Sequence, residues 1–303
     1  MKRVLTAVVL IPVVLAVVFK APLWAFAAVT ALFGLLAAYE YLNIARKLDA
    51  GVPIIAGLVQ SALIFGLLVL ALRAEADRTA ISAAAAVAVL LLLFPLVVLA
   101  YQMRLAEFRS AVISTALVTF AVPYVVVPFA CLVMIRSFPS GWFFILLLFF
   151  MVWSGDIFAY YIGKNFGRRL IAPRVSPKKT WEGTIASVLG SALVAWLLSA
   201  GAPRIEGWLQ ASGGLTSASV FGSPATLQAP PWWVPLMLAV VINVVAQLGD
   251  LAESMLKRAA DVKDSGAILP GHGGMLDRVD ALLFAAPVGM LLFQVTRNFF
   301  YTR

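Results

Sequence analysis

The stretch from residue 141 to residue 163, GWFFILLLFFMVWSGDIFAYYIG, decides the fold class of this chain. Asp156 is the only charged residue in the stretch, which is continuously apolar rather than alternating. About 20 helical residues cross the hydrocarbon core of a bilayer, and a helix satisfies its backbone hydrogen bonds within the segment, as lipid requires. The stretch therefore predicts a transmembrane α-helix.

The rest of the chain has the same character. Of 303 residues, 63% are hydrophobic and only 12% are charged, and the mean hydropathy is +0.99. These values exclude a soluble globular protein, in which roughly a quarter of the residues are charged. We predict an all-α, polytopic integral membrane protein with about nine transmembrane helices, at residues 4–19, 22–45, 52–72, 80–101, 112–135, 141–163, 184–201, 232–250 and 279–300.

The chain is predicted to be a single membrane domain, residues 1–303, without an internal repeat or a linker to a soluble domain. Residues 1–140 form N-terminal helices, and residues 141–303 carry helices and the charged loops. The first run follows two cations but lacks a small-residue cleavage site, so we interpret it as a retained helix. Residues 202–231 are rich in Gly, Ser, Ala and Pro and predict a flexible external loop. The single cysteine, Cys131, excludes an internal disulfide.

Positive charge predicts the orientation. In the nine-helix arrangement, 16 of the 23 Lys and Arg residues fall on the N-terminal side of the membrane. An excess of Lys and Arg marks the cytoplasmic face, so the N-terminus and the loops at 164–183 and 251–278 are expected in the cytoplasm and the C-terminus outside. The net charge of +9 then reflects sidedness, and no nucleic-acid partner is expected.

Residues 254–280, SMLKRAADVKDSGAILPGHGGMLDRVD, form a charged segment: nine of these 27 residues are Lys, Arg, Asp or His. If the preceding helix continues into this segment, five polar positions recur on one face: Asp250, Ser254, Lys257, Arg258 and Asp261. The motif LPGHGG surrounds the only histidine, His272, and predicts a tight turn. Asp277 and Asp280 follow at the start of the last helix and share a face. Two acidic helix ends should therefore face each other across a glycine-rich turn.

This pattern indicates a polyphosphate site. Carboxylates that lie close together repel unless a cation lies between them, and their hard oxygens suit Mg²⁺. Four cations of the segment exceed the need for counterions, and Lys or Arg side chains bind phosphate oxygens that Mg²⁺ leaves free. Those cations are Lys257, Arg258, Lys263 and Arg278. The alternative is a set of solvated loop charges in which His272 caps a turn.

Two further polar stretches lie upstream. Asp156 shares a helix face with Tyr160 and Lys164, and an acid at membrane depth costs about 2.5–3.5 kcal/mol unless it faces protein or a polar cavity. The alternative is an Asp156–Lys164 pair that only fixes packing. In VSPKKTWEG, residues 175–183, we expect Ser176 and Pro177 to begin a turn. Lys178 and Lys179 then either attract anionic lipid or bind a substrate headgroup.

The charged segment resembles, position for position, the pattern of the phosphatidate cytidylyltransferases, or CDP-diacylglycerol synthases. The matching positions are Ser254, Lys257, Arg258, Lys263, Asp264, Gly266, Leu269, Pro270, His272, Gly273, Gly274, Asp277, Arg278 and Asp280. The SPKKTWEG stretch and the Asp156 helix also look like shared segments of that family. The resemblance covers residues 150–300; residues 1–140 match only in being apolar and helical, and the stretch 202–231 is longer than expected.

The resemblance implies a nucleotidyltransferase that joins CTP to phosphatidic acid, giving CDP-diacylglycerol and pyrophosphate for phospholipid biosynthesis. It also implies Mg²⁺ with K⁺ as a second, monovalent cation, a homodimer, contact with membrane lipid, and a bacterial-type inner (cell) membrane.

The expected roles follow from this chemistry. Metal binding is assigned to Asp250, Asp277, Asp280 and Asp156. Phosphate binding is assigned to Lys257, Arg258, Lys263 and Arg278, with Ser254 donating to a phosphate oxygen and His272 orienting a carboxylate or phosphate. The lipid headgroup is assigned to Lys178 and Lys179, with Lys164 as a further substrate-binding residue.

Two alternatives are open from the sequence. Another nucleotide-dependent lipid enzyme, such as a polyprenol kinase, needs the same cations and metal, whereas the acidic motif of the CDP-alcohol phosphotransferases is absent from the sequence. A cation or phosphate transporter would bind its ion at Asp156 and Asp250, but it should spread polar residues through several helices at mid-depth. The gathering of charge in two loops favours an enzyme.

Overall fold

The computed structural model describes residues 12, 14–73, 77–104, 107–215, 227–268 and 273–301. Over these ranges the chain is helical apart from loops, one two-stranded sheet and an isolated β-bridge. Seven of the helical segments are long and apolar enough to cross a membrane. The predicted fold class, an all-α polytopic membrane protein, is confirmed.

The elements follow the predicted runs. In chain order they are α2 (Leu23–Leu48), α3 (Ile54–Arg73), α4 (Asp77–Gln102), α5 (Phe108–Ala121), the π-helical η1 (Val122–Val126), α6 (Val127–Arg136), α7 (Gly141–Phe166), β1 (Leu170–Ala172), β2 (Ser176–Thr180), α8 (Trp181–Ala211), α9 (Trp233–Ala259), α10 (Leu276–Thr296) and the 3₁₀ turn η2 (Arg297–Phe299). Helices α5, η1 and α6 form one continuous span, Phe108–Arg136. Pro123 lies in η1, where its missing N–H breaks the α-helical hydrogen-bond ladder.

The count of nine spans is not confirmed. The seven spanning segments correspond to seven of the nine predicted runs. The run at 52–72 is helix α3, but its apolar stretch, Ile54–Leu68, is shorter than the others. Most of the run at 4–19 lies outside the described residues. Residues 14–20, which include its last part, are described and are helical.

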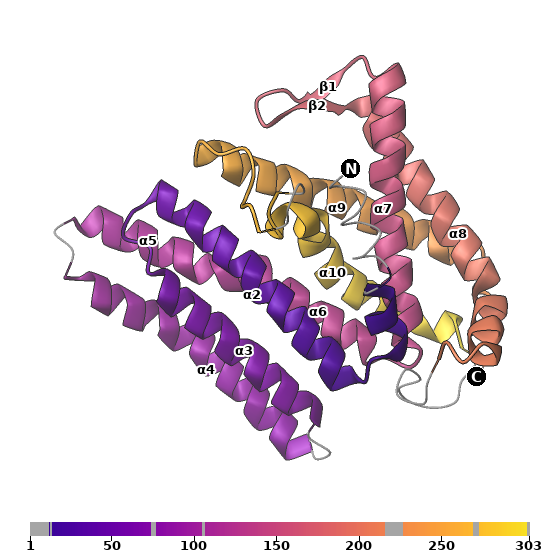
Figure 1. Cartoon of the computed structure of the whole chain (residues 1–303), viewed down its shortest axis with the longest axis horizontal. Helices are drawn as coiled ribbons and strands as arrows, with labels where there is room; N and C mark the ends of the chain where they lie inside the picture. Colours follow the sequence, from indigo (N-terminus) through magenta and orange to yellow (C-terminus); the bar gives the residue numbers. More distant parts are fainter. Residues whose placement is uncertain are drawn as a thin grey trace.

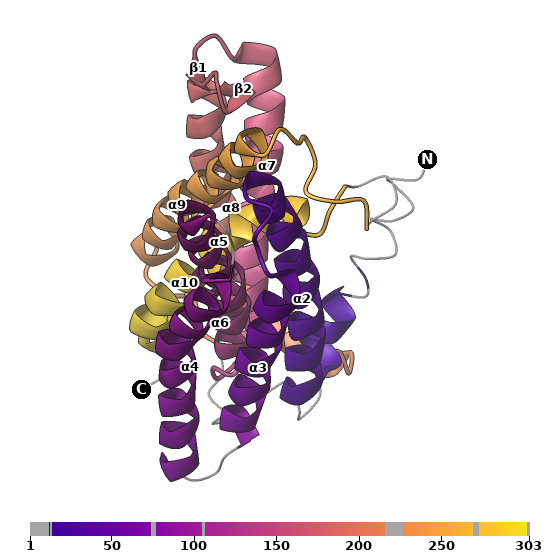
Figure 2. The same ribbon diagram turned by 90° about the vertical axis from the view of Figure 1, so that its left-hand side faces the viewer.

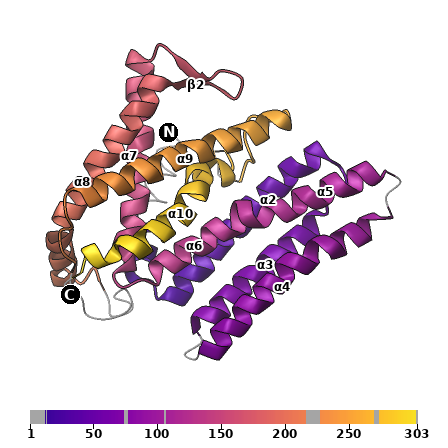
Figure 3. The same cartoon turned by 180° about the vertical axis from the view of Figure 1, so that it is seen from behind.

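The helices pack in a defined order across the molecule. Helix α7 packs along α8, α8 contacts α9, and α9 packs on α10. Helix α10 then contacts α6, which lies against α2, and α3 and α4 follow on the far side (Figures 1 and 3). The core at the beginning of α7 is aromatic, because the ring of Phe144 contacts those of Phe143, Phe293 and Phe300. Large exposed apolar residues such as Leu92 and Val97 of α4 suit contact with lipid.

A buried polar network fixes α9 against α7 and α8. The Asn243 amide donates to the hydroxyl oxygens of Ser187 (3.0 Å) and Ser191 (2.7 Å). The Ser191 hydroxyl donates in turn to the carbonyl of Met151. A Cβ at Gly155 would lie closer than 3.0 Å to these polar atoms, so α7 can approach only because it carries a glycine here. The network sets the rotation of α9, and hence the direction in which its charged end points.

The lysine loop, residues 164–183, contains a β-hairpin that the sequence did not predict. Strand β1 pairs with β2 in antiparallel fashion, with Leu170 opposite Thr180. The turn lies at residues 173–175, so the expectation that Ser176 and Pro177 begin it is wrong: both lie in β2. Figure 2 shows the hairpin level with the adjoining ends of α7 and α8, and Figure 1 shows it extending sideways from them.

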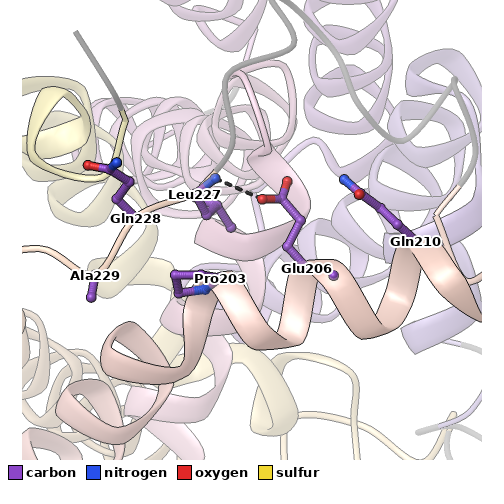
Figure 4. A pocket seen from close by; sticks show the side chains of 7 residues that line it. Pro203, Glu206, Gln210, Leu227, Gln228 and Ala229 are labelled. Atoms are coloured by element: carbon purple, nitrogen blue, oxygen red, sulfur yellow. Dashed lines mark hydrogen bonds between the residues drawn. The ribbon is translucent and has the colours of Figure 1, made fainter.

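The prediction of a flexible loop at 202–231 is wrong for the first third of this segment. Helix α8 continues to Ala211 through Pro203, because most residues beyond that proline are adequate helix formers. Glu206 of this helical extension is buried and accepts a hydrogen bond from the Leu227 amide (2.7 Å), beside a pocket shown in Figure 4. The Gln228 amide donates to the Phe300 carbonyl (2.8 Å), so the described end of the segment is tied to the C-terminal part of the chain.

Candidate functional site

The lysine loop meets helix α9 at one end of the helix bundle, just before the charged segment begins. Lys179 Nζ lies 2.5 Å from Asp250 Oδ2, which joins the base of the hairpin to helix α9. Figure 1 shows the hairpin on the same side of the molecule as the C-terminal end of α9. The lysine loop is therefore in direct contact, through an ion pair, with the helix that continues into the charged segment.

Helix α9 carries the acidic and basic residues of the site on a continuous helical backbone. As predicted, it runs beyond the apolar part of the chain and includes Asp250, Ser254, Lys257 and Arg258. It ends at Ala259, however, so Asp261 is not on the predicted face; its φ of 53° places it in the left-handed region, beyond the helix end. Lys257 and Arg258 lie in the last turn, where cations interact favourably with the helix dipole.

Lys257 lies at the centre of the charge cluster. Its ammonium is 2.7 Å from Asp277 Oδ1, at the start of α10, and also forms an ion pair with Glu253, one turn earlier on α9. Glu253 is fully buried, and its Oε1 has no hydrogen-bond partner among the described residues. One ammonium thus compensates two carboxylates. Facing acidic helix ends with cations between them were predicted, but the acid of α9 in this contact is Glu253 and not Asp250 or Asp261.

Asp277 uses its two carboxylate oxygens differently. Oδ2 accepts hydrogen bonds from the amides of Ser265 (2.9 Å) and Gly274 (2.9 Å), which fix the orientation of the carboxylate. Oδ1 faces Lys257. The carboxylate therefore presents one oriented oxygen to whichever cation lies between α9 and α10.

The remaining predicted acids lie near one another, and Asp280 also lies near Glu253. Asp280 interacts electrostatically with Asp250, Glu253 and Asp156, and Asp156 with Asp250 and Lys179. Within the described ranges, no three Asp, Glu, His or Cys side chains are arranged closely enough to hold a metal ion by themselves. Their oxygens are nevertheless the donors that Mg²⁺ prefers, and Mg²⁺ commonly takes one or two carboxylates and completes its shell with water and substrate phosphates. The donor chemistry fits Mg²⁺.

Other predicted residues lie around the cluster without joining it. Lys178, Arg258 and Lys263 are exposed, and the Ser254 hydroxyl makes a long contact of 3.4 Å with Asp250 Oδ1. Lys164 lies over the ring of Tyr160, 5.7 Å from its centre. No Asp156–Lys164 ion pair is present between these two described residues. His272 lies outside the described residues, so its role stays a prediction.

An apolar cavity of about 160 Å³ adjoins the start of α10. Its lining includes Phe26, Phe149, Trp153 and Leu282, and Arg278 stands among these apolar residues. Arg278 is exposed. A cationic side chain beside an apolar cavity within a membrane protein suits an amphiphilic ligand with an anionic head.

Sequence reasoning missed Glu40 and did not assign Glu253 a role. Glu40 of α2 is 2% exposed, and its carboxylate reaches the charged segment. The signal was available, because Glu40 stands inside an apolar run just as Asp156 does. Glu253 follows Asp250 by three residues and precedes Lys257 by four, so it borders the face that the five predicted positions share, and it is buried.

The fold and the site together define a multi-pass membrane protein whose two charged loops bring lysines and carboxylates together at one end of the helix bundle. The chain belongs to the cytidylyltransferase family: the model described as "Cytidylyltransferase family" matches residues 1–296. The match includes the N-terminal helices, for which the sequence motifs gave no specific evidence.

Several proteins named phosphatidate cytidylyltransferase are similar to the chain. One from Brucella abortus biovar 1 (strain 9-941) is 45% identical over 148 residues, which is 49% of this chain and 46% of the relative. One from Synechocystis sp. is 40% identical over 154 residues, 50% of this chain and 44% of the relative. One from Bacillus subtilis (strain 168) is 37% identical over 171 residues, which is 56% of this chain and 55% of the relative. The similarity thus spans about half the length of the relatives that the chain matches.

Proposed function

We propose that this protein transfers the cytidylyl group of CTP to phosphatidic acid, giving CDP-diacylglycerol and pyrophosphate. The observation that carries the proposal is the Lys179–Asp250 contact, which joins a loop suited to a lipid headgroup to a helix end suited to a nucleotide. The names of the relatives support the same reaction. The apolar cavity beside Arg278 supports a lipid as one of the substrates.

In the proposed reaction, a phosphate oxygen of phosphatidic acid attacks the α-phosphorus of CTP in line. The bond from that phosphorus to the bridging oxygen breaks, and pyrophosphate leaves. The protein contributes position and positive charge rather than a covalent intermediate. Lys257 and Arg258 would hold the triphosphate, with Lys263 and Arg278 nearby, while Lys178, Lys179 and Lys164 would hold the lipid phosphate. Ser254 would donate to a phosphate oxygen, and His272 would orient a carboxylate or phosphate.

Asp250 and Asp277 are the proposed Mg²⁺ ligands, supported by the lysine ammonium that each attracts in this structure. Asp280 and Asp156 add negative charge and are retained as further ligands. When bound, Mg²⁺ would neutralise charge on the triphosphate and on the leaving pyrophosphate. A second, monovalent ion such as K⁺ and a homodimer are proposed from the family resemblance alone. Metal titrations and light scattering of the purified protein test these two proposals.

Two labelled nucleotides test the reaction. With CTP labelled at the α-phosphate, the label should enter the lipid fraction only when phosphatidic acid and Mg²⁺ are both present. With CTP labelled at the γ-phosphate, the label should appear in pyrophosphate. A lipid kinase would instead place the γ-label in lipid, and a transporter would place neither label there. Either of these results would overturn the proposed transfer.

The proposed location is a bacterial-type inner (cell) membrane, with the N-terminus and both charged loops in the cytoplasm and the C-terminus outside. Cysteines at Ser212 and Lys263 test this topology. An impermeant maleimide applied to intact cells should label Ser212→Cys, whereas Lys263→Cys should react only after the membrane is permeabilised. Native Cys131 is buried and should stay silent. Labelling of Lys263→Cys in intact cells would show that the orientation is the opposite of the proposed one. The site would then face the outside and could not bind cytoplasmic CTP.

The two loops should divide the substrates between them. We expect Lys178→Ala with Lys179→Ala to raise chiefly the apparent KM for phosphatidic acid. Lys178→Ala alone leaves the Lys179–Asp250 pair intact and should show part of this effect. Arg258→Ala should weaken CTP use by roughly 10- to 150-fold, the value of a charged hydrogen bond of about 1.5–3 kcal/mol.

Titrations of each substrate against each variant measure this division, with Arg109→Ala as the control. Arg109 is exposed, and the predicted topology places it on the same side of the membrane, outside both loops. Equal shifts for both substrates in the lysine and arginine variants would show a single shared phosphate pocket instead.

A further inference from the structure

The buried carboxylate of Glu40 links the N-terminal helices to the charged segment. Glu40 lies on α2 and is 2% exposed. Its Oε2 accepts a hydrogen bond from the Leu276 amide at 2.8 Å and another from the Ser265 hydroxyl at 3.0 Å. One partner precedes the predicted glycine-rich turn in the sequence and the other follows it, so a single side chain from α2 binds the charged segment at two separate points.

Glu40 also supplies the cap that α10 lacks. The N-cap residue of α10 is Met275, whose side chain forms no capping hydrogen bond. The first amides of a helix have no intrahelical acceptor, and a carboxylate near them interacts favourably with the helix dipole. Because Leu276 is the first residue of α10, the bond from its amide to Glu40 meets this need from another part of the chain.

We call the hydrogen bonds of Glu40 to Leu276 and Ser265 the Glu40 clamp. Ser265 connects this clamp to Asp277. Ser265 receives an amide hydrogen bond from Asp277 at its hydroxyl oxygen (3.2 Å) and donates its own amide to Asp277 Oδ2 (2.9 Å). Ser265 is buried, and its hydroxyl donates to Glu40. The position of Asp277 Oδ1, the oxygen that faces Lys257, therefore depends on a serine that Glu40 fixes.

Two glycines of the charged segment make room for this contact. A Cβ at Gly266 or at Gly274 would lie closer than 3.0 Å to the Glu40 carboxylate. The backbone can therefore approach Glu40 only where no side chain is present. This gives a physical reason for small residues at both positions, independent of any role in binding a substrate.

We propose that Glu40 is a positioning residue of the active site: it caps α10 and holds Ser265, and through them sets the oxygen of Asp277 that faces the cation site. Its effect on turnover rests on the proposed function, whereas its effect on the charged segment does not. Glu40 touches no reacting group in this arrangement, so its influence passes through the backbone and the Ser265 hydroxyl.

Three variants separate this role from general stability. Glu40→Ala removes both hydrogen bonds, whereas Glu40→Gln keeps an oxygen that can accept both. Glu206→Ala is the matched control. Glu206 is also a buried glutamate that accepts a hydrogen bond from a backbone amide, and it lies near the C-terminal end of α8 (Figure 4). The readouts are amide hydrogen exchange of the protein without Mg²⁺ or substrates, and kcat and KM for CTP.

We expect the Leu276 amide to exchange roughly 2- to 30-fold faster in Glu40→Ala, as for loss of a helix cap. Turnover should fall at least about 10-fold, and Glu40→Gln should stay close to the wild type in both measurements. Glu206→Ala should leave Leu276 exchange and kcat unchanged. Wild-type exchange at Leu276 in Glu40→Ala, or equal loss of turnover in Glu40→Ala and Glu206→Ala, would overturn the proposal. If the wild type forms no CDP-diacylglycerol, the proposed function fails while the exchange comparison still decides on the clamp.

Discussion

Replacing Asp277 by asparagine should reduce CDP-diacylglycerol formation at least about 100-fold while the protein still folds. Asparagine keeps one oxygen that can accept the amides of Ser265 and Gly274, so the backbone at these two residues should keep its position. The other position then carries an NH₂ group that points at the Lys257 ammonium, where Oδ1 now lies. The variant loses a metal ligand and places two donors against each other.

Asp261→Asn is the matched control. Asp261 is exposed, lies in the same part of the chain, and has a positive φ that asparagine tolerates equally well. It should keep wild-type turnover. Elution from a sizing column and the thermal midpoint in detergent check folding of both variants, and raising Mg²⁺ tests for weakened metal affinity. Full activity of Asp277→Asn would remove Asp277 from the cation site.

Replacing Lys257 by methionine should lower the free energy of unfolding by about 3–5 kcal/mol, the effect of leaving buried charges without their partner. Lys257 is the ammonium shared by Glu253 and Asp277, and Glu253 is fully buried. Methionine fills a similar volume, so the loss should come from the uncompensated carboxylates rather than from a cavity. Unfolding in mixed detergent micelles measures this change.

A second substitution separates stability from activity. Glu253→Gln removes one of the two carboxylates, so the double variant with Lys257→Met should recover part of the lost stability. It should not recover turnover, because the proposed phosphate contact of Lys257 is still missing. Lys47→Met, an exposed lysine in the last turn of α2, serves as the control and should change neither quantity. An unstable double variant that is no better than Lys257→Met would contradict this account of the cluster.

The helices and the general place of the site could be predicted from the sequence because both follow from composition. Long apolar runs specify spans, and the distribution of Lys and Arg placed the two charged loops on one side, where Lys179 and Asp250 meet. Helical spacing predicted facing acids at the ends of α9 and α10. Lys257 does lie between two such acids, but the one on α9 is Glu253, to which spacing assigned no role.

The features that were missed depend on contacts between distant residues. Spacing along one helix gives no information on Glu40, whose partners lie 225 and 236 residues away. The hairpin was not predicted because its strands are only three and five residues long and β2 contains two lysines. The helical extension after residue 201 was not predicted because its Gly and Pro residues are typical of loops. Asp261 was placed on the helix because periodicity alone does not show where a helix ends.

The bond between Glu40 and Leu276 also has a consequence for synthesis of the protein. A ribosome adds about 5–20 residues per second, so the 236 residues that separate the two partners take roughly 10–50 s to make. During that time α2 is in or near the membrane with a carboxylate whose final partners do not yet exist, within a helix that is otherwise apolar around it. Glu40 must therefore be hydrated or temporarily paired until α10 is made. The candidate site can therefore assemble only after α10 has been made, and a nascent chain interrupted before α10 lacks both the acid of Asp277 and the Leu276 amide that binds Glu40.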